Sequence, residues 1–154
     1  MNKAYVFSHR LFNEKMSELG WTSPEYVPED AAVVSIITGV YDAFPRMFDR
    51  DSSNVITLSF FDTTDPRDIE YPPISEDQAH KLAEFILENV GKTFYIHCAA
   101  GQSRSQAVAR VLEDMFDYEV ETINGGNGCY PNSFVYRMLT SNIEEHLIRE
   151  KEVI

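Results

Sequence analysis

One stretch of the chain, residues 97–105, places a thiol, a glycine and an arginine at spacings suited to chemistry on an anion. It reads His-Cys-Ala-Ala-Gly-Gln-Ser-Arg-Ser. The apolar run before Cys98 predicts a strand, and the pattern from Ser105 onward predicts an amphipathic helix, so the small residues between them form a tight loop. The backbone N–H groups of such a loop, together with the positive end of the following helix, bind phosphate-like anions.

Four side chains around this loop have expected roles. Cys98 lies in a positive field that favours the thiolate, which is the nucleophilic form of the residue. Arg104 can donate two hydrogen bonds to two oxygens of one phosphate group. Ser105 can donate to the sulfur and so favour the thiolate as a leaving group, or it is an ordinary first-turn helix serine. His97 is expected to orient the loop and tune the thiol rather than to act as a base.

The phosphate-binding groups are expected to be the backbone amides of the loop. They belong to Ala99, Ala100, Gly101, Gln102, Ser103 and Arg104. None of these residues is a lysine, and the chain has a net charge of -12 from 25 acidic and 13 basic residues. Such a charge disfavours nucleic-acid partners and anionic membranes, and it also disfavours polyanionic substrates. The predicted substrate is therefore a phosphorylated protein or a small phosphate monoester.

The segment resembles the His-Cys-x5-Arg-Ser/Thr motif of the cysteine-based protein tyrosine phosphatases, and it looks most like their small dual-specificity branch and its compact microbial and viral relatives. A weaker resemblance extends from about Ala4 to about Glu145. The resemblance implies a phosphatase that hydrolyses phosphotyrosine, phosphoserine or phosphothreonine through a cysteinyl-phosphate intermediate, without a metal or cofactor. Two alternatives remain: a pseudophosphatase module that binds phosphorylated partners without turnover, and another thiolate reaction such as sulfur transfer or arsenate reduction. Cys98 would otherwise be a small buried hydrophobe.

The reaction also needs an acid that protonates the leaving oxygen. Asp62 directly follows the predicted strand 55–60, and in the resembling family the general acid occupies that place. Asp65 and Asp68 are the alternatives on the same acidic segment. Asp65 precedes Pro66, which favours an extended conformation and can turn the carboxyl group away. Asp62 is therefore the predicted general acid.

Two residues near a late predicted helix complete the candidate set. Asn132 follows a proline, and dual-specificity phosphatases carry a Pro-Asn pair at the start of a late helix, where the asparagine side chain supports the phosphate loop. A plain N-terminal helix residue is the alternative. Cys129 is interpreted as a buried structural cysteine, and the alternative is a thiol that traps oxidised Cys98 as a disulfide.

Hydrophobic patterning predicts the elements that position these residues. Strands are predicted at 4–7, 33–38, 55–60 and 94–97, and helices at 11–19, 75–90, 105–115 and from about 131. Alternating strands and helices predict an α/β fold with a mostly parallel central sheet of about four to five strands and helices on both faces. The resemblance implies that this fold is protein tyrosine phosphatase-like. Residues 1–154 are expected to form one domain.

The compartment is predicted from the two cysteines and from the apolar runs. Cys98 and Cys129 do not form a disulfide framework, and a reactive thiolate suits a reducing compartment. No run is apolar and long enough for a membrane span, and the N-terminus has no signal-peptide core. We therefore expect a cytoplasmic protein without membrane or nucleic-acid partners, and we expect a monomer.

Overall fold

The computed structural model describes residues 1–152. Its elements, in chain order, are β1 (Lys3–Phe7), α1 (His9–Leu19), β2 (Ala31–Ile37), β3 (Val55–Ser59), α2 (Glu76–Asn89), β4 (Thr93–His97), α3 (Arg104–Phe116), β5 (Glu119–Ile123) and α4 (Ser133–Glu152). Two short 3-10 turns lie at Pro24–Tyr26 and Gly39–Tyr41. All the predicted strands and helices are present, and the predicted α/β fold is confirmed.

The strands form one five-stranded sheet in the order β3-β2-β4-β1-β5. Every neighbouring pair is parallel. All strands therefore end at the same side of the sheet, which we call the carboxyl edge, and begin at the opposite side, the amino edge. The hydrophobic pattern missed β5, because Glu119 and Glu121 are exposed on this outermost strand and no apolar run marks it.

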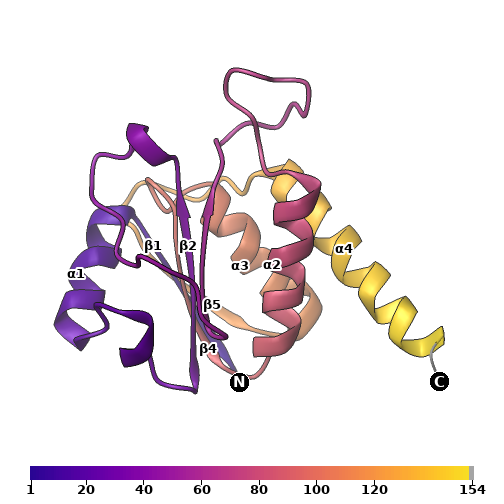
Figure 1. Cartoon of the computed structure of the whole chain (residues 1–154), viewed down its shortest axis with the longest axis horizontal. Coiled ribbons are helices and arrows are strands. Elements are labelled where there is room, and N and C mark those ends of the chain that lie inside the picture. The colour runs from indigo at the N-terminus through magenta and orange to yellow at the C-terminus, as the bar shows by residue number, and fades with distance from the viewer. Residues whose placement is uncertain (153–154) are drawn as a thin grey trace.

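Helices cover both faces of the sheet (Figure 1). On one face α1 packs through Phe12 and Met16 against a core that includes Val33. On the other face α2, α3 and α4 pack against a larger core that includes Val34 and Leu82. Successive residues of β2 thus point to opposite faces, and the whole strand is buried, which fits its apolar sequence.

The segment between β3 and α2 is held at both ends. Ser75 and Gln78 form a capping box, in which the Gln78 N–H donates to Ser75 Oγ (3.1 Å) and the Ser75 N–H donates to Gln78 Oε1 (3.0 Å). Gln78 Nε2 also donates to the carbonyl of Ser59, the last residue of β3 (2.7 Å). The start of α2 is therefore tied to the carboxyl edge, and the intervening segment, which carries Asp62, lies over that edge.

The long helix α4 packs on the same side as α2 and α3. Val135, Leu139 and Ile143 are buried in the shared core, whereas Arg149 and Lys151 occupy the last turn. Among the helices that the structure describes, none combines the length and the apolar character needed to cross a bilayer.

Candidate functional site

The loop from Cys98 to Arg104 joins β4 to α3 at the carboxyl edge and packs tightly against β1. Gly101 has φ +66°, and a Cβ atom there would lie 2.6 Å from the carbonyl group of Phe7 and 2.7 Å from the amide nitrogen of Ser8. Both the backbone angle and the close approach require glycine. The end of β1 therefore fixes the curvature of the loop.

The carbonyl groups of the loop are bonded to donors outside it. Ala99 O accepts from His9 N (3.0 Å), and Ala100 O accepts from Asn127 Nδ2 (3.2 Å). Gly101 O accepts from both Asn124 Nδ2 (3.0 Å) and Gln106 Nε2 (3.1 Å). Gln102 O accepts from Tyr130 N (2.8 Å), and Ser103 O accepts from Asn132 N (3.1 Å). The amides from Ala99 to Arg104 donate to no residue that the structure describes. The loop therefore retains a set of unused backbone donors, as an anion-binding loop requires.

The thiol of Cys98 lies at the base of this loop. The residue is only 2% exposed. Its Sγ lies 3.0 Å from Oγ of Ser105, which is fully buried. Once the sulfur is ionised, only the hydroxyl can donate this hydrogen bond, so Ser105 is positioned to stabilise a thiolate.

Arg104 presents an unused donor beside the loop. The residue is 4% exposed, and its Nη1 donates to the carbonyl of Phe60 (2.6 Å). Its Nε is buried and has no hydrogen-bond partner among the described residues. A buried guanidinium donor without an acceptor is costly. An oxyanion bound at the loop would supply the missing acceptor.

His97 is fully buried beneath the loop. Its Nδ1 lies 3.1 Å from the Cys98 carbonyl, which can only accept, so Nδ1 carries the proton. Its Nε2 lies 2.6 Å from Ser35 Oγ, which therefore donates to it. Burial, with a smaller contribution from nearby His9, lowers the pKa of His97 to about 3. The ring is therefore neutral near pH 7 and bonded to the Cys98 carbonyl and to Ser35; its roles in orienting the loop and tuning the thiol stay predictions.

Asp62 reaches the loop from the neighbouring segment after β3. Its Oδ1 accepts hydrogen bonds from Ser103 Oγ and from Asn132 Nδ2, both at 2.7 Å. The structure thus brings the predicted general acid to the loop that carries the predicted nucleophile. Its side chain is exposed, so it can meet a ligand from solvent.

The two alternative acids are engaged elsewhere. Asp65 forms an exposed ion pair with Arg67 (3.0 Å). Hydrogen bonds from Arg67 lower the pKa of Asp65 below its usual value. Asp68 accepts from the amides of Glu70 (3.1 Å) and Tyr71 (2.9 Å), so it stabilises its own turn. Neither carboxyl group hydrogen-bonds a loop residue in the described structure.

Asn132 has a different contact pattern from the one the resemblance implied. Its backbone N–H, not its side chain, bonds to Ser103 of the loop. Its Nδ2 donates to Asp62 and to the Thr63 carbonyl (3.1 Å), and its Oδ1 accepts from the first amides of α4. The side chain therefore caps α4 and holds the Asp62 segment, and it supports the loop only indirectly.

The interpretation of Cys129 as a buried cysteine is wrong. The residue is exposed, and Arg110 Nη2 lies 3.3 Å from its sulfur. Its neighbour Gly128 has φ +91° within a turn that lies outside both cores. No apolar run surrounds Cys129 in the sequence, so the neighbouring residues could have indicated that it is exposed.

Sequence reasoning missed the polar residues that support the loop from other elements. Asn124 follows β5, and the glycines after it in the sequence indicate only a turn, yet it is buried and its Nδ2 donates to the Gly101 carbonyl. Ser35 is the one polar residue in the apolar run of β2, a signal that a partner such as His97 is required. The backbone amide of His9 gave no sequence signal.

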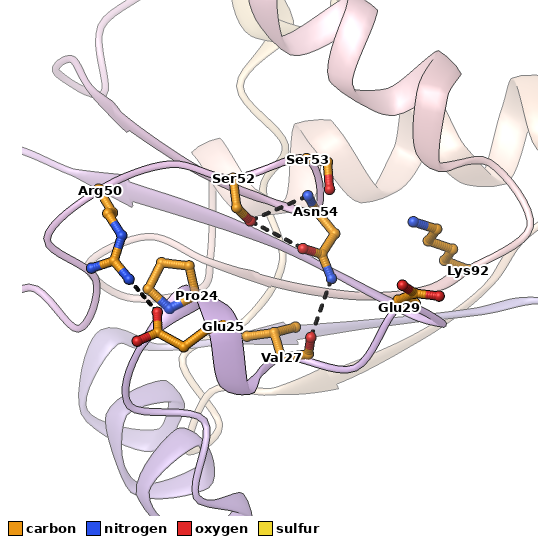
Figure 2. A pocket seen from close by; sticks show the side chains of 9 residues that line it. All are labelled: Pro24, Glu25, Val27, Glu29, Arg50, Ser52, Ser53, Asn54 and Lys92. Carbon is orange, nitrogen blue, oxygen red and sulfur yellow. Dashed lines mark hydrogen bonds and ion pairs between the residues drawn. The ribbon is translucent and has the colours of Figure 1, made fainter.

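A hollow lies at the opposite, amino edge of the sheet (Figure 2). Its volume is about 580 Å³, and its lining consists of Pro24, Glu25, Val27, Glu29, Arg50, Ser52, Ser53, Asn54 and Lys92. Arg50 pairs with Glu25, and Asn54 Nδ2 donates to the carbonyls of Pro28 (2.9 Å) and Ala31 (3.1 Å). The side chains of Arg50, Glu25 and Asn54 in this hollow are thus already bonded within the protein. The carboxyl edge is the candidate site.

Comparison with known proteins gives no further identification: no protein-family model, no curated protein and no solved structure matches the chain. The chemistry of the site is therefore derived from its own residues. They provide a buried thiol with a hydroxyl partner, a loop of unused amides, a guanidinium with an unpartnered donor, and a carboxyl group at hydrogen-bond distance from the loop.

Proposed function

We propose that this chain is a cysteine-dependent phosphatase that hydrolyses phosphate monoesters, with phosphotyrosine, phosphoserine and phosphothreonine of proteins as its substrate class. The observation that carries the proposal is the buried Nε of Arg104, which has no partner within residues 1–152, beside a loop whose carbonyl groups are bonded outward and whose amides are unused there. A phosphate dianion would accept hydrogen bonds from the Arg104 Nε and from the backbone amides of the loop. The resemblance to dual-specificity protein tyrosine phosphatases points to the same chemistry.

In the first step Cys98 Sγ attacks phosphorus, so that a sulfur–phosphorus bond forms as the bond to the leaving oxygen breaks. The equatorial oxygens are held by the loop amides and by Arg104, which stabilise the charge of the transition state. Asp62 donates its proton to the leaving oxygen, which departs as a neutral alcohol or phenol.

In the second step water attacks the phosphorus of the cysteinyl-phosphate. Asp62, now ionised, accepts a proton from that water. The sulfur–phosphorus bond breaks, and the sulfur leaves as a thiolate to which Ser105 donates a hydrogen bond. Inorganic phosphate is released, and the cycle consumes one water without a metal or cofactor.

The setting of the reaction follows from the thiol and the surface charge. The two cysteines are free, and a catalytic thiol must stay reduced, so we propose a reducing, cytoplasmic location. A net charge of -12 does not favour a nucleic-acid substrate. Phosphorylated proteins therefore remain the proposed partners of a monomeric enzyme.

One contact favours a second candidate, a phosphate-binding module without turnover. Asp62 already accepts hydrogen bonds from Ser103 and Asn132, and it thereby joins the loop to α4. A carboxylate kept only for this structural link would be present even if the pocket bound phosphorylated partners and never hydrolysed them.

Hydrolysis of p-nitrophenyl phosphate in the presence of EDTA distinguishes the two candidates. The wild-type chain should turn over, and a phosphate adduct should be trapped on the Cys98 peptide by acid quench and mass spectrometry. Cys98→Ser should abolish both signals while phosphate binding changes by less than about tenfold, because the anion-binding loop is retained. Wild-type binding without turnover would support the binding module. Hydrolysis by Cys98→Ser at the wild-type rate would refute the proposed nucleophile.

A further inference from the structure

A cluster of metal-binding side chains lies between α2 and α4, outside the proposed phosphatase site. His80 and Glu84 are one helical turn apart on α2, and His146 faces them from α4. One ligand atom from each residue lies within 4.8 Å of the others. The His80 and His146 rings stack with their centroids 4.8 Å apart. Two helices thus bring three potential ligands to one point.

The hydrogen bonding of the cluster is incomplete. His80 Nε2 lies 2.9 Å from Glu84 Oε1, but His146 Nε2 lies 3.9 Å from the same oxygen, beyond hydrogen-bond distance. His146 Nε2 is buried and has no hydrogen-bond partner among the described residues. A buried ring nitrogen without a partner is unusual in a folded protein and needs an explanation. A bound cation would provide one, because neutral imidazole nitrogen is a good metal ligand.

The types of ligand indicate the class of ion. Two imidazoles and one carboxylate form the protein ligand set of many zinc sites that keep a fourth position for water. Imidazole suits Zn²⁺ and similar transition metals, whereas Mg²⁺ and Ca²⁺ prefer oxygen ligands. Tetrahedral Zn²⁺ places its ligand atoms about 3.3 Å apart at ordinary bond lengths. The present separations, from 2.9 Å to at most 4.8 Å, lie on both sides of that value.

The surroundings of the cluster also suit a cation. Its two histidines line a hollow of about 240 Å³ whose other residues include Glu76, Asp77 and Asn142. The basic residue on this hollow, Arg149, is paired with Glu145 (2.6 Å). The chain as a whole has a net charge of -12, which raises the local concentration of cations.

We propose that His80, Glu84 and His146 form a binding site for one Zn²⁺-class transition-metal ion that bridges α2 and α4. Asn132, whose side chain holds Asp62, immediately precedes α4, and α2 follows the segment that carries Asp62. The ion therefore stabilises the packing of the two helices that flank this segment. The site does not depend on phosphatase activity.

The test is calorimetric titration of the full chain with Zn²⁺, together with thermal unfolding to measure the Tm. Mg²⁺ is the comparison ion in both measurements. One Zn²⁺ per chain should bind saturably, and at about a hundredfold excess over the dissociation constant it should raise the Tm by about 5–10 °C. Mg²⁺ at the same concentration should leave the Tm unchanged. Zn²⁺ that fails to bind saturably would overturn the proposal.

Matched variants and a Co²⁺ spectrum identify the ligands. His80→Asn and His146→Asn should each weaken Zn²⁺ binding by at least about tenfold, which is the usual effect of disturbing a metal site. Glu88→Gln, one turn further along α2, and Cys129→Ser should bind as the wild type does. Bound Co²⁺ should show d–d bands without a thiolate charge-transfer band. Unchanged binding in both histidine variants, or loss of binding in Cys129→Ser, would refute this site.

Discussion

The two edges of the sheet differ in whether their hydrogen-bond donors are satisfied, and cavity size does not report this difference. The amino edge has the hollow of about 580 Å³ in Figure 2, with Arg50 paired to Glu25 and Asn54 bonded on all sides. The carboxyl edge carries a compact loop with unused amides and a buried Arg104 whose Nε has no partner among the described residues. Unsatisfied donors, rather than empty volume, are therefore the basis for proposing an anion-binding site at the carboxyl edge.

The difference follows from the direction of the chain. In a parallel sheet all strands deliver their following residues to one edge, so that residues from β1, β3, β4 and β5 meet around the loop. At the amino edge the chain arrives from helices and turns, and Arg50 pairs with Glu25 while Ser52 bonds Asn54. Substitutions at the two edges should therefore separate effects on activity from effects on stability.

The largest expected contrast is between two arginines. Arg104→Lys should lower kcat/KM by about 10²–10⁴, because a point charge cannot replace two directed guanidinium donors on a phosphate. Arg50→Lys, at the amino edge, should leave kcat/KM within about twofold of wild type, since exposed ion pairs contribute little. Steady-state assays on p-nitrophenyl phosphate measure both. Near-normal activity of Arg104→Lys would contradict the proposed phosphate-binding role.

Next in size is the contrast between two acids of the same segment. Asp62→Asn should lower kcat by about 10²–10³ on an alkyl phosphate, whose leaving oxygen needs a proton. The loss should shrink on an electron-poor aryl phosphate, which leaves without protonation. The amide oxygen of the variant can still accept from Ser103 and Asn132, so the loop should keep its position.

Asp65→Asn is the matched control. Asp65 is held by Arg67, so this variant should behave as wild type on both substrates. If Asp65→Asn instead shows the loss that depends on the leaving group, the two roles must be exchanged. If neither variant shows it, the proton donor lies elsewhere, or the pocket only binds.

The sequence allowed much of this arrangement to be predicted, because the motif around Cys98 is local. Loop, strand and helix follow from adjacent residues, and the parallel sheet brings Asp62 to the same edge. The supporting contacts were not predictable in this way. Asn124 reaches Gly101 across β1, and the Asn132 side chain reaches Asp62, and such contacts depend on the packing of distant elements.

Two buried asparagines extend the comparison to stability. Asn54→Ala and Asn124→Ala each remove hydrogen bonds to buried carbonyl groups, and each should lower the free energy of unfolding by about 1–3 kcal/mol. Only Asn124→Ala should also lower kcat/KM, by about 10–100-fold, because it removes one of the two side-chain hydrogen bonds that hold the Gly101 carbonyl of the loop. Urea unfolding and steady-state kinetics measure the two effects. An equal loss of activity in Asn54→Ala would contradict the separation of the edges.

The smallest expected effect concerns the buried His97 at the carboxyl edge. Burial lowers its pKa from 6.5 to about 3, so the unfolded chain binds a proton that the folded chain does not. Below pH 6.5 the free energy of unfolding should therefore fall as the pH falls, and the His97 contribution should approach about 1.4 kcal/mol per pH unit. Its contribution to stability is present in full above pH 6.5 and is lost progressively toward pH 3. Urea unfolding between pH 6.5 and pH 5 tests this before most carboxyl groups titrate.

Two variants separate burial from hydrogen bonding as the cause. His97→Asn should reduce the slope of unfolding free energy against pH by the His97 contribution, while buried His9 retains its own, because burial also lowers the pKa of His9. Ser35→Ala removes the hydroxyl partner of His97 but leaves the ring buried. It should therefore lower stability at every pH and keep the slope. If Ser35→Ala abolishes the slope and His97→Asn does not, the pH dependence does not come from the buried ring.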